Sequence, residues 1–468
     1  MKKIENSKNK KDSVKIKENI NIKKEEKIIN EKREKNRIDK KYKVLKFILI
    51  MALSVIIIEL LIMLILYFKN ENNINYMDTI NNVKLIDNKY YLGAGSSNFR
   101  YSKYNDKKVY EYHDSITDTD KRIIAEQAKL VKYDNDMNIV WEKTFDTKYD
   151  STYYDATLVS DGIIAVGSYI YDYEQIEARV RDGLIVKYDS EGNFKWFKNY
   201  QILGDTEFYK VINVSDGIIA IGQSIYENME LGNHTNGGGI IVKLDYDGNI
   251  IWANNFGGNK SGSFNDIVVV NDGYIVCGKD GANYGLIAKF SKNGELKWHY
   301  STYELAVTDS YGFNAMKLHN NKLYIASSIN YSDEKNDKGE PIYKFKGCIF
   351  VYDLNGKCIN RYRSDKVESF TNLITSTEGI TAIGYTTDLE NKKYANQTSS
   401  IVKFNYDGKE SISEYYGGLN NDILTTIIDN NYAYLTFGYS NSFGNKKDYK
   451  VVYIDISKRE NTIFELND

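Results

Sequence analysis

Four histidines are the residues of this chain best suited to acid–base or metal chemistry, but their spacing supports neither. They are His113, His234, His299 and His319, and no H-x-x-x-H or H-E-x-x-H pair places two imidazoles on one helix face. No G-x-S-x-G sequence supplies an exposed nucleophile. We therefore expect no catalytic, metal-binding or cofactor-binding residues, and a protein that is not an enzyme.

The segment Asp245-Tyr-Asp-Gly248 is similar to the start of a calcium-binding loop. A twelve-residue loop of that kind requires Glu at its last position, where this chain has Phe256. The same spacing recurs along the chain, which favours a turn over a metal site.

Tyrosines and charged residues are frequent in five long segments that connect apolar runs. These segments are Ser96–Gln127, Tyr169–Arg181, Ile225–Gly237, Ile329–Phe345 and Tyr385–Thr398. A Tyr side chain offers contact area at low entropic cost together with a polar tip, as binding surfaces need. The candidate ligand-binding residues are Tyr110, Tyr112, Tyr169, Tyr171, Tyr173, Tyr226, Tyr385 and Tyr394. The alternative is that these are ordinary surface loops of a Tyr-rich chain.

A repeat predicts the scaffold that would position these loops. Its first half is an apolar alternation, a tight turn and an apolar run ending in Gly, as in Val211–Gly222. Its second half is an apolar run, a turn and a strand with Trp, as in Ile240–Trp252. Seven copies of each half alternate, which predicts an all-β, seven-bladed β-propeller of four-stranded antiparallel blades over residues 78–465. We expect contiguous blades, with strand exchange between the ends as the alternative.

The turns and the Trp residues agree with that architecture. Sequences such as Asp189-Ser-Glu-Gly192 predict a type I turn followed by a left-handed Gly. Met137 stands at the Gly position of one copy, where a left-handed Met would cost about 1–2 kcal/mol, so that turn is expected to adopt another form. Trp141, Trp196, Trp252 and Trp298 recur four residues beyond this position. We expect them to pack blade against blade.

These motifs, with Phe256-Gly-Gly258 and Tyr416-Gly-Gly418 leading to the next repeat, resemble the PQQ-like propeller repeats of bacterial envelope proteins. The resemblance covers nearly all of residues 78–465 and implies the fold. Quinone-binding enzymes of that superfamily typically have eight blades, a calcium site and adjacent Cys residues. The chain shows none of these, so the resemblance implies no quinone cofactor here.

The N-terminal part predicts a membrane anchor. Residues 1–46 carry 18 Lys and Arg against 8 Asp and Glu, and are expected to be a disordered or partly helical cytoplasmic tail. The next 22 residues, 47–68, are apolar except for Ser54 and Glu59, and as a helix they would span about 33 Å. A cleaved signal peptide is the alternative. Residues 69–77 would be a linker to the propeller outside the cell membrane.

Glu59 would lie near the middle of this span, either as a neutral side chain or as a contact to another membrane helix. The tail could touch anionic lipid near Lys40–Lys46, and we expect no nucleic-acid partner. Three Cys residues are too few for a disulfide framework, so Cys277, Cys348 and Cys358 are expected to be free and buried.

We interpret the chain as a single-pass membrane protein whose propeller binds an envelope protein partner as an adaptor. A cell-wall glycan is the alternative ligand. A propeller enzyme is the least favoured hypothesis.

Overall fold

The structure is a computed structural model, and it describes two units of the chain separately. The described residues are 27–47, 49, 51, 79–98, 109–114, 119–124, 126–145, 147, 150–170, 181–202, 204–225, 227–228, 233–234, 238–256, 262–302, 310–387, 397–416, 422–429, 434–440, 450–455 and 464–465. The first unit is Met1–Ile74 and the second is Asn75–Asp468.

In the first unit, residues 27–47 form a helix whose side chains are exposed. The segment is rich in Lys, Glu and Arg, which have high helix propensity, and Glu31 precedes Lys35 by four residues. This part of the tail is therefore helical. The described residues contain no helix long and apolar enough to cross a membrane. The predicted span 47–68, with Glu59, lies outside the described residues except at Phe47, Leu49 and Met51.

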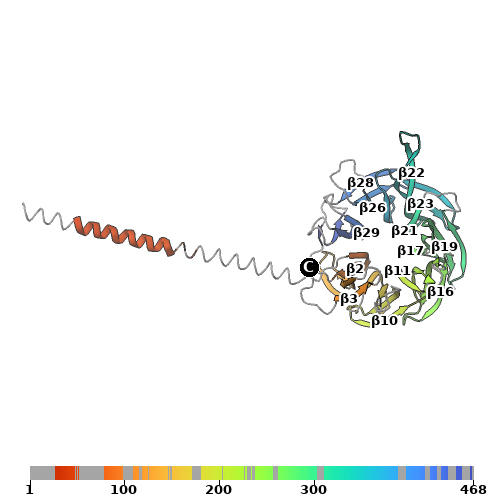
Figure 1. The fold of residues 1–468 in the computed structure, drawn as a ribbon, viewed down its shortest axis with the longest axis horizontal. Helices are drawn as coiled ribbons and strands as arrows, with labels where there is room; N and C mark the ends of the chain where they lie inside the picture. The colour runs from red at the N-terminus through yellow and green to blue at the C-terminus, as the bar shows by residue number, and fades with distance from the viewer. Residues whose placement is uncertain are drawn as a thin grey trace, which may run out of the picture. The chain divides into compact units, whose positions relative to one another are not determined.

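The second unit is an all-β propeller of four-stranded antiparallel sheets arranged in chain order around a central axis (Figure 1). Sheet 1 contains β1 (Thr79–Ile86), β2 (Tyr90–Asn98), β5 (Glu126–Tyr133) and β6 (Ile139–Thr144). Sheet 2 contains β7 (Ser151–Val159), β8 (Gly162–Ile170), β9 (Arg181–Tyr188) and β10 (Phe194–Tyr200). Sheet 3 contains β11 (Asp205–Val214), β12 (Gly217–Ile225), β15 (Gly238–Leu244) and β16 (Ile250–Phe256).

The later sheets repeat the same order. Sheet 4 contains β17 (Ser263–Val270), β18 (Gly273–Lys279), β19 (Gly285–Ser291) and β20 (Leu296–Ser301). Sheet 5 contains β21 (Ser310–His319), β22 (Lys322–Lys335), β23 (Pro341–Asp353) and β24 (Cys358–Arg363). Sheet 6 contains β25 (Ser369–Thr375), β26 (Ile380–Thr386), β27 (Thr398–Phe404) and β28 (Glu410–Tyr416). Sheet 7 contains β29 (Asp422–Asp429), β30 (Tyr434–Ser440), β31 (Lys450–Asp455) and β32 (Phe464–Glu465).

The prediction of a seven-bladed propeller requires a correction. Sheets 1 to 6 are complete blades, whereas the outer strand of sheet 7, β32, has only two described residues. The segment between β31 and β32 has no Gly, so it lacks the Gly-containing turn that joins the outer strands of sheets 2 to 6. The described propeller is thus six complete blades and a seventh sheet that is short at its outer edge.

The ring closes between sheet 7 and sheet 1 without exchange of a described strand, as expected. The inner strands β29 and β1 are in contact. Thr425 Oγ1 donates to Ile80 O at 2.9 Å, and Val83 N donates to Thr426 Oγ1 at 3.3 Å. Side chains of both sheets share one buried hydrophobic cluster, which includes Ile80, Val83, Met137, Ile428 and Phe437.

The predicted role of the Trp residues is confirmed. A Cβ built on Gly192 would lie 3.1 Å from Trp141 of the preceding sheet, and one built on Gly294 would lie 2.7 Å from Trp252. Each of these left-handed glycines therefore fits under a Trp ring of the neighbouring blade. The repeated turn connects the two outer strands of its own blade and also contacts the preceding blade.

Met137 is the exception at this position, and the expectation of a different turn was wrong. Its φ is 64°, and its N–H donates to Asp134 O at 3.1 Å, as in the Gly turns. The side chain is buried in the cluster between sheets 7 and 1. It shares this cluster with Ile428 and Phe437 of sheet 7. This packing offsets the backbone strain.

The segments between the second and third strands of the sheets differ from simple loops. Within Ser96–Gln127 lies the hairpin of β3 (Val109–Asp114) and β4 (Thr119–Ile124), and a shorter pair is formed by β13 (Glu227–Asn228) and β14 (Asn233–His234). The predicted loop Ile329–Phe345 is mostly strand, because β22 and β23 continue beyond the blade to a turn at residues 336–339. This extended hairpin projects from the ring in Figure 1.

The cysteines are free. Cys277 and Cys348 are buried as predicted, but Cys358 is only half-buried. Cys348 pairs across its hairpin with Arg363, and Cys358 pairs with Tyr352, so the two thiols are not opposite one another.

Candidate functional site

The inner strand of every sheet carries a β-bulge at the same place. The bulges lie between Ile80 and Asn82, Tyr153 and Asp155, Phe208 and Lys210, Phe264 and Asp266, Tyr311 and Ala315, Phe370 and Asn372, and Leu424 and Thr426. A bulge adds an unpaired residue and turns its side chain out of the ladder. The sequence therefore places one extra side chain per sheet along the wall of the central channel.

The recurring Gly at the end of the apolar run is required by this bulge. A Cβ on Gly278 would lie 1.9 Å from Ser263 O, and one on Gly222 would lie 1.8 Å from Glu207 O. Sheet 5 has Ser327 in this position, where its bulge is wider and leaves three residues unpaired. Ser327 Oγ donates there to Tyr311 O at 2.6 Å. The wider bulge brings Gly312 to the channel.

Bulge residues join neighbouring sheets in a belt of hydrogen bonds. In five sheets, an Asn or Thr side chain donates to a carbonyl of the next inner strand. The pairs are Asn81 to Tyr153 (2.7 Å), Asn265 to Phe313 (2.8 Å), Asn314 to Phe370 (2.8 Å), Thr371 to Leu424 (3.1 Å) and Thr425 to Ile80 (2.9 Å). The belt holds the inner strands together around the channel.

Sheets 2 and 3 have tyrosines at the bulge instead. The rings of Tyr154 and Tyr209 pack edge to face with centroids 5.2 Å apart. Tyr209 OH donates to Glu207 Oε2 at 2.6 Å, and Glu207, which is buried, also accepts from Gln223 Nε2 at 2.8 Å and pairs with Arg181. Burial and the neighbouring Glu207 charge raise the pKa of Tyr209. We call Tyr154, Arg181, Glu207, Tyr209 and Gln223 the tyrosine cluster.

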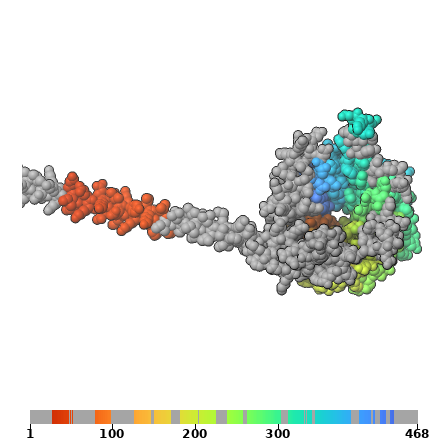
Figure 2. Space-filling view, viewed as in Figure 1, coloured from red at the N-terminus to blue at the C-terminus, as the bar shows by residue number. Residues whose placement is uncertain are grey.

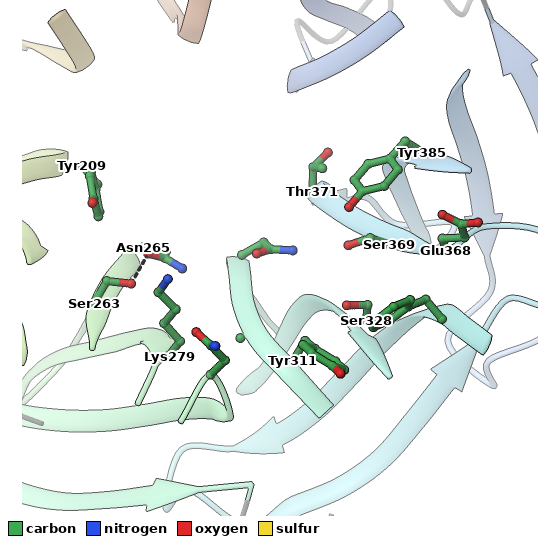
Figure 3. Close-up of a pocket in the computed structure, with 14 residues that line it drawn as sticks. Tyr209, Ser263, Asn265, Lys279, Tyr311, Ser328, Glu368, Ser369, Thr371 and Tyr385 are labelled. Atoms are coloured by element: carbon green, nitrogen blue, oxygen red, sulfur yellow. Dashed lines mark hydrogen bonds between the residues drawn. The ribbon is translucent and has the colours of Figure 1, made fainter. Parts of the chain in front are cut away.

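A pocket of about 650 Å³ lies beside this cluster at the face that carries the connections between second and third strands. Figure 2 shows the propeller hollowed near the centre of the ring, and Figure 3 shows the pocket with its lining side chains. The lining residues are Tyr209, Ser263, Asn265, Lys279, Asn283, Tyr311, Gly312, Asn314, Ser328, Phe345, Glu368, Ser369, Thr371 and Tyr385. Most of them come from sheets 4, 5 and 6.

The lining is built from equivalent positions of these three sheets. Across the first two strands of each sheet, Ser263 pairs with Lys279, Tyr311 with Ser328, and Ser369 with Tyr385. The bulge residues Asn265, Asn314 and Thr371 complete the wall. The repeat thus fixes where the side chains stand, while their chemical types vary.

The connection after β18 leaves the pocket open on the side of sheet 4. It is a short turn in which Asn283 has a φ of 67° and donates its N–H to Asp280 O at 3.0 Å. Asn tolerates the left-handed conformation better than most residues, and here it also lines the pocket. The corresponding connections of sheets 1, 2, 3 and 6 are longer, and in sheet 5 the strands β22 and β23 themselves extend before a turn of similar length.

The candidate residues from the sequence fall in three groups. Tyr385 lines the pocket, on β26. Tyr169 is half-buried on β8 and packs on the cluster between sheets 1 and 2, while Tyr110 and Tyr112 lie on β3. Tyr171, Tyr173, Tyr226, Tyr394 and Glu59 lie outside the described residues. No finding tests ligand binding by these residues, so their role stays a prediction.

Sequence reasoning missed most of the pocket because it looked for sites in loops. Ser263, Asn265, Lys279, Ser328 and Ser369 are strand residues. One signal could have found them, because Lys279, Ser328 and Tyr385 each follow the recurring Gly or its Ser327 substitute. Positions that vary inside an otherwise constant repeat are candidates for recognition.

Buried charged groups stabilise the inner strands. Asp155 is fully buried, accepts from Lys84 Nζ at 2.7 Å and from Val211 N at 2.9 Å, and so joins sheets 1, 2 and 3. Burial lowers the pKa of Lys84 despite the Asp155 charge. Burial alone would raise the pKa of Asp266, but Lys317, Lys210 and two backbone N–H groups lower it overall. These interactions give Lys84, Asp155 and Asp266 a structural role.

The described residues contain no group of three or more His, Cys, Asp or Glu that could hold a metal ion. The Asp245 carboxylate of the calcium-like segment accepts from Asn249 N at 2.7 Å and Asp247 N at 3.0 Å. It therefore closes its own turn.

The fold and the pocket define the class as a β-propeller with a polar site at the mouth of its channel. No family model matches the chain, and no curated protein matches it. Among solved structures, the chain is similar to a putative 6-phosphogluconolactonase from Bacteroides uniformis, at 9% identity, 72% coverage of this chain, 90% of that chain and a TM-score of 0.43.

Two further solved structures are also similar to the chain at low sequence identity. A putative 6-phosphogluconolactonase from Bacteroides fragilis shows 8% identity, 82% and 95% coverage and a TM-score of 0.45. Drosophila Semaphorin 1b, extracellular domains 1-2, shows 11% identity, 53% and 52% coverage and a TM-score of 0.32. We expected from the sequence that this chain is not an enzyme. The similarity to the two putative 6-phosphogluconolactonases contradicts that expectation, and it is withdrawn. At these identities and TM-scores, the likeness assigns no activity to this chain.

Proposed function

We propose that this protein is a membrane-anchored binding module whose propeller takes a saccharide segment in the pocket of sheets 4 to 6. The observation that carries the proposal is the lining of this pocket. Its volume of about 650 Å³ is typical of ligand sites, which range over about 300–1,000 Å³. It combines amides and hydroxyls with four aromatic rings.

The chemistry of the lining suits a sugar ring. Asn283, Ser328 and Ser369 carry amide or hydroxyl groups that both donate and accept hydrogen bonds, as sugar hydroxyls also do. The faces of Tyr209, Tyr311, Phe345 and Tyr385 offer apolar area for the C–H side of a sugar. Tyr311 and Phe345 pack edge to face with centroids 4.8 Å apart, so this part of the wall is preorganised.

The test is calorimetry of the full-length chain with soluble cell-wall oligosaccharides. We expect Tyr385→Ala and Asn283→Ala each to weaken binding roughly tenfold, since each removes a wall contact. The matched control is Tyr415→Ala, because Tyr415 is exposed on the outer strand β28. Equal affinities of the wild type and both pocket variants would place the ligand elsewhere and contradict the proposal.

A protein partner is the second candidate, and the extended hairpin of β22 and β23 favours it. The hairpin continues the blade to the turn at residues 336–339, with Lys335 and Glu340 exposed. A projecting pair of strands offers backbone groups for pairing with another chain. Shortening it to a turn after Asn330 should abolish co-purification of an envelope partner while leaving saccharide binding unchanged.

Membrane attachment through residues 47–68, with the tail in the cytoplasm and the propeller outside, is part of the proposal. Its support is the apolar run and the excess of Lys and Arg before it. Protease added to intact cells should degrade the propeller and spare the tail. Glu59→Leu should weaken any complex formed inside the membrane. Kinship with PQQ-like repeats stays a prediction from the sequence motifs.

A further inference from the structure

Lys279 is a half-buried lysine that lines the pocket without a partner. Among the residues that the structure describes, its ammonium group makes no ion pair and no hydrogen bond. Other lysines of the propeller are neutralised in place. Lys187 Nζ lies 2.7 Å from Asp161, and Lys243 Nζ lies 2.7 Å from Asp216. The unpaired charge of Lys279 is therefore available to a ligand.

The register explains why Lys279 has no acid opposite it. In sheet 3, the equivalent residue Gln223 pairs across the strands with Glu207, whereas in sheet 4 Lys279 pairs with Ser263. At the same position the other sheets have Ser96, Ser168, Ser328, Tyr385 and Tyr439, all uncharged. A charged side chain is therefore not needed at this position for the hydrogen-bond belt or for the packing of a blade.

The nearest acids along the chain are already engaged. Asp280 accepts from Ala282 N and Tyr284 N with one oxygen and from Ser301 Oγ with the other. Asp266 is buried, accepts from Ile267 N and Met316 N, and lies 3.9 Å from Lys317. Both carboxylates accept hydrogen bonds from other groups, and neither forms an ion pair with Lys279.

Groups around Lys279 can add neutral hydrogen bonds to an anion. Figure 3 shows the Lys279 side chain extending beside Asn265, whose side-chain oxygen accepts from Ser263 Oγ at 2.9 Å. Asn283, in the turn that follows β18, also lines the pocket. Gly312 gives the lysine stem its space, because a Cβ on Gly312 would lie 2.8 Å from Lys279 Cβ. The wide bulge of sheet 5 thereby sets the position of this charge.

We propose that Lys279 binds an anionic group, a carboxylate or a phosphate, carried by the saccharide in this pocket. The inference rests on the proposed function and specifies its ligand as an acidic saccharide. A lysine ammonium is a compact point charge that suits either anion.

Glu368 sets the orientation of such a ligand. It lines the opposite side of the pocket, next to Tyr385, and accepts from Thr387 Oγ1 at 2.5 Å (Figure 3). Its negative charge repels an anion and leaves the sheet 6 side for neutral hydroxyls. The acidic group therefore lies at the sheet 4 side, beside Lys279.

The test compares three probes by calorimetry of the full-length chain. The probes are a trigalacturonate, the same trimer fully methyl-esterified, and a galactose trimer with one phosphate on each sugar. The esterified trimer keeps the saccharide and removes the charge, and the third probe distinguishes phosphate from carboxylate. The variants are Lys279→Gln and Glu368→Gln. The control is Lys297→Gln, since Lys297 pairs with Glu295 at an exposed turn.

We expect the trigalacturonate or the phosphate trimer to bind the wild type at least about tenfold more tightly than the ester. Lys279→Gln should remove that difference, Glu368→Gln should strengthen acidic binding about twofold, and Lys297→Gln should change nothing. Equal binding of charged and esterified trimers would overturn the inference and leave the saccharide site intact. Binding of none of the probes would overturn both. Thermal unfolding of each variant confirms that the propeller is folded.

Discussion

Substitution of Gly285 by Ala tests the inter-blade packing on which the pocket depends. Gly285 begins β19, and a Cβ at this position would lie 2.5 Å from Cε1 and 2.7 Å from Cζ of Phe313 in the next sheet. Its φ is not in the left-handed region, so the effect of the new methyl group is steric. Gly183 and Gly239 meet Phe208 and Phe264 in the same way, which makes this contact a rule of the repeat.

The surroundings prevent relaxation at Gly285. Its N–H donates to Thr302 Oγ1 at 3.0 Å and its carbonyl accepts from Thr302 N at 2.8 Å. The Phe313 ring is fully buried and packs on Phe350 and Tyr352 with centroids 5.3 and 5.9 Å away. Overpacking of this kind costs about 1–3 kcal/mol, and with both sides fixed we expect a value near the upper end.

Urea unfolding of the full-length chain, followed by Trp fluorescence, measures the loss. The control is Gly339→Ala, where φ is 78° and nothing lies within 4 Å, so only backbone strain of about 1 kcal/mol applies. In a double-mutant cycle, Phe313→Leu should relieve part of the Gly285→Ala penalty. A penalty below about 0.5 kcal/mol, or strict additivity with Phe313→Leu, would refute the packing argument.

Three further outcomes follow from described contacts. Thr425→Val removes the 2.9 Å bond to Ile80 O at the ring closure and should lower the free energy of unfolding by about 1 kcal/mol in urea titrations. Met137→Gly relieves about 1 kcal/mol of left-handed strain but loses a buried side chain, so calorimetric unfolding should show a net loss of stability. Burial raises the pKa of Tyr188 to about 12 and also raises that of Tyr153, so their contribution is complete below the unfolded pKa near 10 and falls as the pH rises toward 12. Unfolding midpoints should therefore drop above pH 10.

Local sequence signals predicted most of the scaffold. The period, the Asp-x-x-Gly turns and the Trp spacing each depend on residues close together in the chain, and the sheets follow them. The Met137 turn could not be predicted in this way. Its penalty is local, whereas its compensation comes from Ile428 and Phe437, nearly three hundred positions away in the sequence. The outer strand of sheet 7, β32, has only two described residues, and the segment before it lacks the Gly of the repeated turn. The prediction of seven blades relied on the number of repeats and gave this missing Gly too little weight.

The pocket was harder to predict than the fold, because its chemistry depends on register. Lys279 and Gln223 follow the same Gly in their repeats, and only the cross-strand pairing shows that one faces Ser263 and the other Glu207. The candidate Tyr385 was chosen as a loop residue, yet it reaches the pocket from a strand. Loop composition supplied one lining residue, Tyr385, whereas the other described candidates, Tyr110, Tyr112 and Tyr169, do not line the pocket.

The distribution of exceptions in the repeat argues for function at this face. A ring scaffold presents the same structural demand at each equivalent position, and five sheets meet it at the bulge with Asn or Thr. The departures are Tyr154 and Tyr209 at the bulge, Lys279 after the recurring Gly, and the wider bulge with Gly312. Three of them, Tyr209, Lys279 and Gly312, line one pocket, and this concentration supports the proposal that the pocket takes a ligand.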